Sequence, residues 1–562
     1  MSVKAMSSAK NGGTVGKGAI ILLLSSVIVK LIGAFFKIPL ASDKVLGDLG
    51  FGYFSVAYDI FTPIYTVATA GFPVAISKIL SNLAAKESDI AVKPMFFAAR
   101  RLLFTSGIIF SALFALVVLI FTWASDGDGY SLYPVLAVAP SVLFCFAASA
   151  YRGYYEGVGS MGRVAASNVI EALGKLILGL GFAYVTVKVT QSFALAATAA
   201  ISGVAVGSLL AAVYLHLIFK YRQKNNCRTG NVLCTHTVKA LSAVFLPIAL
   251  ASLSGCIVSL IDALTVRSLL FSLFKSSPGV LKDSYSQLVA EMGMAVTDSE
   301  IATALYGIRS KAYTLVNLVP TFTVAIGISA IPILSQLFAK GDKSNLIKNI
   351  NSVLKLISVI AFPAGVGMLC MSNRIMYLLY GVDASAEIGG GILRIYSAAV
   401  IFAGFTLPVG CALQAVGRQR TVLVNVIIGV GFKLAGNIIL CSVPQINVYG
   451  AVYSTVICYG VMLALHLLAL LRLTGSLPDK NSVLIKPFVA ACLCGIAAYS
   501  VAKLSDSSVV TALAIIIAAV VYVVCLLLFN TFKDEEIADF PFGNQILRLK
   551  NKKKMKNFPK IR

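Results

Sequence analysis

Charged side chains are scarce in this sequence. Asp, Glu, Lys and Arg make up 12% of the 562 residues, whereas hydrophobic residues make up 58%. Soluble globular domains carry about 25% charged residues, so this composition excludes a water-soluble protein of this length. An α-helix needs about 20 predominantly apolar residues to cross a bilayer, and the chain offers such stretches repeatedly. The composition therefore indicates an integral membrane protein.

Acidic residues and histidines are the scarcest ionisable groups. The chain has 23 Asp and Glu against 47 Lys and Arg, and its three histidines, His216, His236 and His466, form no cluster in the sequence. A membrane enzyme that transfers or polymerises lipid-linked sugars should gather acids, bases or metal ligands in sizeable loops, so we expect no enzyme. The spacing of Cys227, Cys234 and His236 matches no zinc motif, and neither a metal site nor a cofactor is predicted.

Apolar stretches recur along the chain and predict an all-α integral membrane protein with about 14 transmembrane helices. The predicted spans lie near residues 18–40, 52–74, 96–124, 131–151, 163–187, 192–219, 240–270, 304–334, 352–373, 388–414, 420–443, 448–472, 485–503 and 508–532.

Basic residues concentrate in alternate links between these spans, as cytoplasmic loops do. The basic links include those holding Arg152 and Arg163, Lys220 and Arg228, and the tail from Arg548. The excess positive charge therefore predicts topology and contact with membrane lipids rather than a nucleic-acid partner. We expect a multi-pass protein of the cytoplasmic membrane, a monomer, with both termini in the cytoplasm.

The sequence contains an internal repeat. Residues 79–86 (ILSNLAAK) match residues 333–340 (ILSQLFAK) at six of eight positions with an offset of 254. Val158-Gly159 matches Val416-Gly417, and Lys175-Leu176 matches Lys433-Leu434, both at an offset of 258. Six spans separate the copies, so the two halves have the same orientation. Parallel repeats related by an axis along the membrane normal are a recurrent transporter design.

The repeat predicts six segments of the chain. They are a cytoplasmic N-terminal segment (1–17), an N-lobe of helices 1–6 (18–219), a cytoplasmic linker (220–239), a C-lobe of helices 7–12 (240–474), helices 13–14 (484–532) and a basic cytoplasmic tail (533–562).

Ionisable residues inside spans are functional candidates because burying a charge in lipid is costly. The candidate cations are Lys30 and Lys37 on the first span, Lys175 on the fifth, Arg309 and Lys311 on the eighth, and Lys433 on the eleventh. The candidate acids are Asp59, Glu171 and Asp262. Structural readings compete with these roles: Glu171 and Lys175 are spaced for an internal ion pair, Lys37 and Lys311 are placed to reach the interface, and the others can be paired within the bundle.

The cationic bias favours an anionic cargo such as a phosphate or pyrophosphate head group. A lipid-linked substrate fits this preference, because its tail can stay in the membrane while the head group crosses. The predicted substrate-binding cations are Lys30, Lys37, Lys175 and Arg309. An exporter of organic cations would need the opposite sign, and it is the alternative transporter reading.

A second set of residues is predicted to couple transport to an energy source. Lys433 and Asn437 are one helical turn apart and are expected to approach Asp262, with Thr455 as a further member. Lys433 would take the place of a bound cation. The sequence leaves open whether a proton, a sodium ion or the membrane potential drives the cycle.

Three stretches resemble the multidrug, oligosaccharidyl-lipid and polysaccharide exporter superfamily. They are residues 71–78 (GFPVAISK), 151–157 (YRGYYEG) and 304–309 (ALYGIR). Within that superfamily the chain is similar to the polysaccharide transporter branch, which contains stage V sporulation protein B-like proteins and lipid II flippases.

This resemblance implies a V-shaped core like that of multidrug exporters, and alternating-access flipping of an undecaprenyl-pyrophosphate-linked oligosaccharide or peptidoglycan precursor. It also implies that Lys30 and Arg309 contact pyrophosphate and that Asp262 and Asn437 belong to a sodium site. Three departures bear on this: position 30 has lysine instead of arginine, Lys37 is displaced by one residue from its counterpart, and Lys433 stands where a neutral sodium ligand is expected.

Overall fold

The apolar stretches fold as helices because, in lipid, a helix bonds its backbone polar groups internally. The computed structural model describes residues 12–85, 89–124, 129–222, 256–293, 296–475 and 479–532. Thirteen helical segments among them are long and apolar enough to cross a membrane. The 29-residue helix α2 (Gly12–Leu40) occupies the place of the first predicted span. The expected all-helical membrane fold is thereby confirmed.

After α2 the remaining helices follow in chain order. They are α3 (Gly47–Thr66), η2 (Val67–Gly71), α4 (Phe72–Ala85), α5 (Asp89–Ala124), α6 (Gly129–Leu136), α7 (Ala139–Gly157), α8 (Met161–Thr190), α9 (Phe193–Arg222), α11 (Ile257–Ser276), α12 (Pro278–Ser284), α13 (Ser286–Met292), α14 (Asp298–Val316), α15 (Leu318–Ala339), α16 (Lys343–Tyr380), α17 (Ala384–Ala415), α18 (Gln419–Cys441), α19 (Val448–Thr474), η3 (Lys480–Ile485), α20 (Lys486–Ala502) and α21 (Ser508–Leu528).

The internal repeat is visible in the local structure of both halves. The second span of each half is a broken helix, since a π-helical turn separates α3 from α4 and Asn317 separates α14 from α15. Gly159 and Gly417, which the repeat makes equivalent, both have positive φ (72° and 80°) in the turns after α7 and α17. Glycine adopts this conformation without the steric cost of a Cβ.

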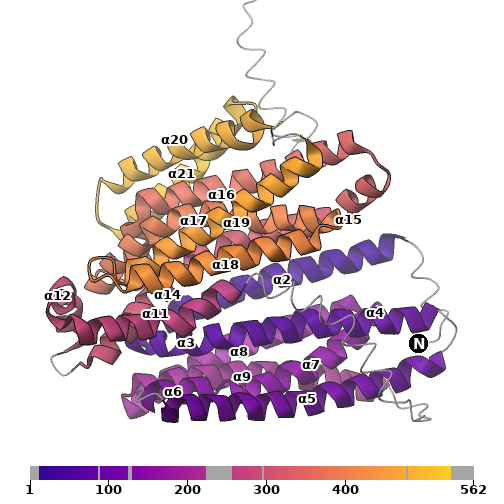
Figure 1. Ribbon diagram of the computed structural model, residues 1–562, viewed down its shortest axis with the longest axis horizontal. Helices are drawn as coiled ribbons and strands as arrows, with labels where there is room; N and C mark the ends of the chain where they lie inside the picture. The colour runs from indigo at the N-terminus through magenta and orange to yellow at the C-terminus, as the bar shows by residue number, and fades with distance from the viewer. Residues whose placement is uncertain are drawn as a thin grey trace, which may run out of the picture.

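The helices of each half pack in the same pattern. In the first half α8 packs on α9 and α2, and α7 packs on α4, α5 and α9; in the second, α18 packs on α19 and α11, and α17 packs on α15, α16 and α19. Figure 1 shows the two halves one above the other, with α2 between them and the α20–α21 hairpin on the far side of the second half, against α16. We call the halves the N-lobe (α2–α9) and the C-lobe (α11–α19).

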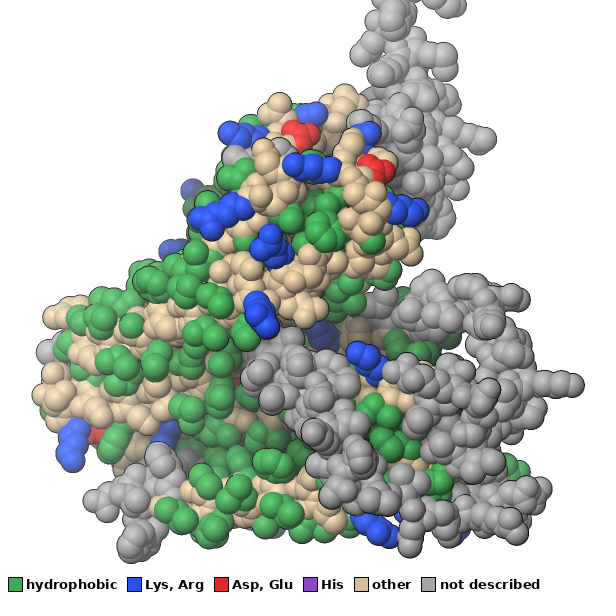
Figure 2. Space-filling view, turned by 45° about the vertical axis from the view of Figure 1, so that its right-hand side comes forward, with side chains coloured by type: hydrophobic (Ala, Val, Ile, Leu, Met, Phe, Trp, Pro, Cys, Tyr) green, Lys and Arg blue, Asp and Glu red, His purple; other side chains and the backbone are tan. Residues whose placement is uncertain are grey.

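The outer surface has the side-chain distribution of a membrane protein. Figure 2 shows hydrophobic side chains over the flanks, with Lys and Arg gathered at the end of the C-lobe that is turned toward the viewer. Residues 223–239 of the predicted linker (220–239), the predicted tail (533–562) and the first part of the seventh predicted span, 240–255, lie outside the described residues.

The lobes contact each other mainly through α3 and α14. The two backbones touch because both helices have glycine at the crossing: a Cβ on Gly52 would lie 2.1 Å from the carbonyl oxygen of Thr303, and a Cβ on Gly307 would lie 2.2 Å from that of Asp48. We call this contact the seam. It lies toward the end of the bundle that carries α12, at the left in Figure 1, and we call that end the α12 end.

Candidate functional site

A lysine ammonium group lies in a cage of oxygen atoms inside the C-lobe. Lys433 Nζ on α18 is 2.6 Å from Asp262 Oδ1, 2.7 Å from Thr455 Oγ1, 2.8 Å from the Ala451 carbonyl oxygen and 3.0 Å from Ser454 Oγ. The side chain of Lys433 is 0% exposed. Four oxygen atoms around one positive charge are the surroundings that an oxygen-coordinated cation would need.

Asp262 on α11 is the centre of this cluster. Its Oδ1 accepts hydrogen bonds from Lys433 Nζ and, at 2.9 Å, from Asn437 Nδ2, while its Oδ2 accepts one from Arg309 Nη1 at 2.7 Å. One carboxylate thus serves two buried cations, and the side chains of Asp262 and Arg309 are both 0% exposed. We call Asp262, Arg309, Lys433, Asn437 and Thr455 the C-lobe cluster.

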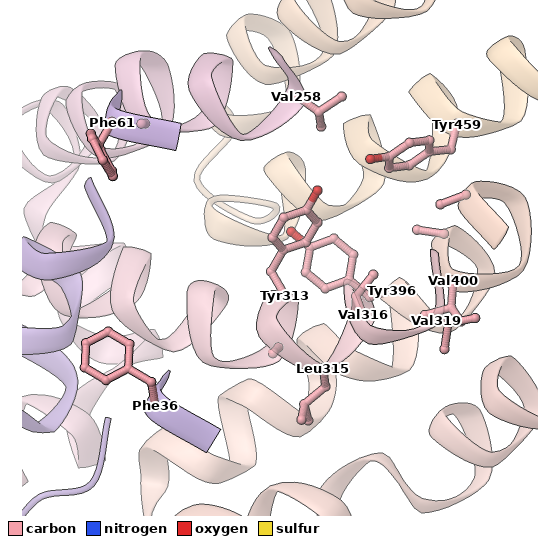
Figure 3. Packing of buried hydrophobic residues seen from close by; sticks show 14 of the residues in the cluster. Phe36, Phe61, Val258, Tyr313, Leu315, Val316, Val319, Tyr396, Val400 and Tyr459 are labelled. Carbon is pink, nitrogen blue, oxygen red and sulfur yellow. The ribbon is translucent and has the colours of Figure 1, made fainter. Parts of the chain in front are cut away.

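The cluster includes aromatic partners on neighbouring helices. Arg309 Nη1 also donates to the Tyr396 hydroxyl at 3.1 Å, and its guanidinium lies 5.6 Å from the ring centre of Tyr313. Figure 3 shows Tyr313 and Tyr396 side by side, with Tyr459 nearby. Nε and Nη2 of Arg309 have no acceptor among the described residues. The guanidinium therefore keeps two donors that the bond to Asp262 does not use.

Arg309 also connects the cluster to the seam. Its guanidinium lies over the ring of Tyr306 on α14, 4.7 Å from the ring centre. The Tyr306 hydroxyl donates to Asp59 Oδ2 of α3, in the other lobe, at 2.8 Å. Asp59, a buried acid in the second span, thus contacts the C-lobe through a tyrosine. A change of charge in the cluster can reach the interface between the lobes through these contacts.

The N-lobe has a buried charge cluster of its own. Glu171 on α8 accepts from Arg152 Nη2 of α7 at 2.6 Å, from Lys175 Nζ at 2.7 Å and from Ser208 of α9 at 2.9 Å. Arg152 and Glu171 are 3% exposed, whereas Lys175 is 13% exposed. The ion pair expected from the spacing of Glu171 and Lys175 is therefore formed.

Two lysines of the N-lobe lie over tyrosine rings of α3. Lys37 Nζ is 4.5 Å from the ring centre of Tyr58, and Lys175 Nζ is 4.2 Å from that of Tyr65. Tyr58 and Tyr65 are seven residues apart and share one face of α3. Cation–π attraction holds each ammonium group over its ring, and Lys175 also keeps its ion pair with Glu171. Lys30, seven residues before Lys37 on α2, has an exposed side chain.

The seam carries acidic groups at the α12 end. Lys311 of α14 pairs with Asp48 of α3 at 2.6 Å, and Ser385 of α17 donates to the same carboxylate at 2.7 Å. Burial raises the pKa of Asp43 in the turn before α3, with Asp48 and Glu291 raising it further and Lys311 opposing the shift.

The structure changes the reading of three basic residues. Arg152, assigned to a loop, is buried in α7, because that helix continues to Gly157. Lys311, expected to reach the interface, is 1% exposed and bonded to Asp48. Arg309, predicted to bind the substrate with Lys30, Lys37 and Lys175, is bonded to Asp262 in this conformation, and its substrate role stays a prediction.

Sequence reasoning missed several partners of these residues. Asp48, Tyr306, Tyr396 and Ser454 carry no signal as single residues, because each acts through a contact with a distant segment of the chain.

The sequence matches two family models. Residues 15–338 match the model described as polysaccharide biosynthesis protein. Residues 312–532 match the model described as lipid II flippase MurJ.

Three curated relatives from Bacillus subtilis (strain 168) are similar over most of the chain. Uncharacterized membrane protein YabM is 27% identical, and the matched region covers 94% of this chain and 95% of YabM. Lipid II flippase MurJ is 24% identical, covering 82% and 83%, and stage V sporulation protein B is 22% identical, covering 95% and 99%.

Solved structures share the fold at low sequence identity. Lipid II flippase MurJ in an inward closed conformation has a TM-score of 0.64 at 15% identity, covering 91% of this chain and 99% of that one. A multidrug resistance MATE family transporter of the MOP superfamily, in an inward-facing conformation, has a TM-score of 0.61 at 13% identity, covering 81% and 98%. The family models and the relatives confirm the expected resemblance to polysaccharide transporters and lipid II flippases, and the solved structures show the shared fold.

Proposed function

The chain belongs to the polysaccharide biosynthesis protein family, and we propose that it flips a lipid-linked, pyrophosphate-bearing oligosaccharide or peptidoglycan precursor across the cytoplasmic membrane by alternating access. The observation that carries this proposal is the set of N-lobe lysines beside the lobe boundary: Lys37 and Lys175 over the tyrosines of α3, and Lys30 two turns before Lys37. The relatives named as lipid II flippase and stage V sporulation protein B support it.

The sign of these charges selects the cargo. Lys37 and Lys175 come from different helices, yet their ammonium groups lie along one face of α3. Seven residues of helix separate the two tyrosines by about 10.5 Å along the axis. Phosphate oxygens spread over a pyrophosphate head group can contact ammonium groups placed in a row, and the low dielectric of the membrane strengthens this attraction. An organic cation would be repelled by Lys37 and by the Arg152–Glu171–Lys175 cluster, which holds two cations for one acid.

The seam supports movement of one lobe against the other. Among the described residues, two polar side-chain contacts join α3 and α14 beside the glycine contact: the Asp48–Lys311 ion pair and the Asp59–Tyr306 hydrogen bond. A small set of polar links beside a close backbone contact can separate as a unit, as rigid-body rocking requires. The charge bias of the loops favours an α12 end outside the cell, and we infer that this conformation is closed outward.

We also propose that the C-lobe cluster couples the cycle without a bound sodium ion. The ammonium group of Lys433 is bonded to the oxygens of Asp262, Thr455 and their neighbours, and a second cation there would be repelled. Protonation of Asp262 or release of Lys433 would change the charge beside Arg309 and reach the seam through Tyr306. The drive is then a proton or the membrane potential.

Translocation by the full-length protein in sealed vesicles tests the proposed function. A fluorescent polyprenyl-pyrophosphate disaccharide is placed in the membrane, and the fraction protected from an external quencher is followed over time. Lys30→Ala and Lys37→Ala should each slow translocation at least about tenfold, because each removes a charge-assisted contact to phosphate. Lys503→Ala, an exposed lysine after α20, is the matched control. Equal rates in all three variants contradict the cationic cargo site.

The coupling proposal has a separate test. Translocation is measured against pH, membrane potential and sodium concentration for the wild type, Asp262→Asn and Lys433→Ala. We expect a wild-type rate independent of sodium, and altered pH or potential dependence in both variants. Unchanged dependence in both variants, or a wild-type requirement for sodium, refutes the coupling role of the cluster.

A multidrug exporter is the second candidate, because MATE transporters share the fold. Organic cations added to the same vesicles distinguish the two candidate functions, since a multidrug exporter would transport the cations and the proposed flippase would not. A polyprenyl-sugar transferase is a third reading, and it predicts a covalently altered lipid after incubation.

A further inference from the structure

A polar cavity of about 650 Å³ opens in the C-lobe near the α12 end. The α12–α13 segment forms one wall, α16 and the start of α17 form another, and the turn between α18 and α19 closes a third side. Ten of its fourteen lining residues have polar side chains. Ligand pockets have volumes of about 300–1,000 Å³ and are usually mostly apolar, so this one is suited to an unusually hydrophilic ligand.

The floor of the cavity depends on three consecutive glycines at the start of α17. A Cβ on Gly389 would lie 2.5 Å from Met376, one on Gly390 would lie 2.2 Å from Asn373 Oδ1, and one on Gly391 would lie 2.8 Å from the Tyr449 hydroxyl. Glycine inside a helix costs about 1 kcal/mol relative to alanine. The run is explained by close packing at all three positions, at the third against the Tyr449 side chain that lines the cavity.

The charges of the cavity favour neither a strongly anionic nor a strongly cationic ligand. Glu387 and Arg394, two turns apart on α17, are exposed and carry opposite charges. A pyrophosphate would be repelled by the carboxylate, and an organic cation would be repelled by the guanidinium. A neutral ligand rich in hydroxyl groups can donate to Glu387 and accept from Arg394. The side-chain amides of Asn373 and Gln445 add both donors and acceptors.

The cavity adjoins the seam. Ala384 lines it, and its backbone N–H donates to Glu291 at 3.2 Å, while the next residue, Ser385, donates to Asp48 of the N-lobe at 2.7 Å. A ligand in the cavity would therefore lie one residue from a contact that holds the lobes together.

We propose that this cavity binds a neutral sugar chain at the α12 end, where the glycan of the cargo emerges. The proposal rests on the proposed function for the source of the glycan, and on the cavity alone for its chemistry. Sugar hydroxyls bond to Glu387, Arg394 and the amides, and the partly apolar rings pack against Tyr449.

Binding to the full chain in lipid nanodiscs tests the assignment. The probe is N,N′-diacetylchitobiose, a neutral disaccharide, and inorganic pyrophosphate and trilysine are the charged comparisons. We expect saturable binding of the disaccharide alone, weakened at least about tenfold by Arg394→Ala and by Glu387→Gln, because each removes a charge-assisted hydrogen bond. Lys282→Ala and Asp283→Asn are the matched controls, since both side chains are exposed and outside the cavity.

The outcomes separate this inference from the proposed function. Three results would overturn the cavity assignment, even when the lipid-linked cargo is still translocated. They are no saturable binding of the disaccharide, equal binding by the cavity variants and the wild type, and stronger binding of pyrophosphate or trilysine than of the disaccharide. Disaccharide binding that is weakened in the cavity variants supports the cavity assignment. If the same preparation translocates no cargo, the proposed function fails and the cavity assignment stands.

Discussion

Replacing Asp262 by asparagine perturbs the C-lobe cluster at its centre. The carboxylate is 2.6 Å from Lys433 Nζ and 2.7 Å from Arg309 Nη1, and all three side chains are fully buried. At an effective dielectric constant of about 20, charge centres about 4 Å apart attract by about 4 kcal/mol. Asparagine removes both attractions and leaves two buried cations facing each other.

The expected loss is smaller than the sum of the two attractions, because each cation keeps other partners. Lys433 still bonds to Thr455 and its neighbours, and Arg309 to Tyr396. We therefore expect Asp262→Asn to lower the free energy of unfolding by about 3–5 kcal/mol, the usual cost of breaking a buried pair from one side. Lys433→Met should cost only about 1–3 kcal/mol, since one carboxylate then faces one cation.

A double-mutant cycle makes the reasoning refutable. In the Asp262→Asn background, Lys433→Met removes an uncompensated charge, so the double variant should be no less stable than Asp262→Asn alone. Unfolding is measured by titrating a denaturing detergent into mixed micelles at pH 7, with Lys503→Met as the control. Additive losses, or a loss below about 1 kcal/mol for Asp262→Asn, refute the account of one carboxylate serving two cations.

Three further predictions concern the N-lobe and the seam. Gly52→Leu places a side chain where the backbone of α14 lies, so crosslinking of cysteines introduced across the seam should fall several-fold. Gly33→Leu, whose side chain would meet open space, is the control and should leave the crosslinking unchanged. Unchanged crosslinking in Gly52→Leu as well would refute the backbone contact. Burial raises the pKa of Asp43, so the folded state binds the Asp43 proton more tightly than the unfolded chain does, and the stability that this proton contributes is lost as the pH rises above about 4. Asp43→Asn should therefore stabilise the protein at pH 7 and not below pH 4. A gain in stability that persists at pH 3, measured by urea or detergent unfolding, would contradict that sign. Tyr58→Leu removes the ring under Lys37 and should raise the apparent KM for a pyrophosphate-linked cargo about two- to fivefold, with kcat little changed. An unaltered KM would show that Tyr58 does not position Lys37 for the cargo.

The spans and the repeat could be predicted because both are local properties of the sequence. An apolar stretch about 20 residues long is visible without tertiary structure, and the match of Lys175 with Lys433 located the eleventh span as the partner of the fifth. The hypothesis that Lys433 and Asn437 approach Asp262 agrees with the distances in the C-lobe cluster. Their role in coupling is still a prediction.

The partners that sequence reasoning missed depend on how helices are oriented against one another. The sequence assigns Arg152 to a loop because the predicted span ends at 151, six residues before α7 ends. Lys311 is paired with Asp48 only because glycines allow α3 and α14 to touch. The sequence alone makes Arg309 available to a substrate, because its partner, Asp262, lies 47 residues away in the chain.

The central claim is that cationic side chains of the N-lobe accept an anionic, lipid-linked cargo. Its most direct test measures translocation of a polyprenyl-pyrophosphate disaccharide and of the same lipid with a neutral ether linkage, in one set of vesicles, by the wild type and by Lys37→Ala. We predict that the wild type moves the pyrophosphate lipid at least about tenfold faster than the neutral one, and that Lys37→Ala removes most of this preference. Equal rates for the two lipids, or a preference unchanged in the variant, would contradict the account.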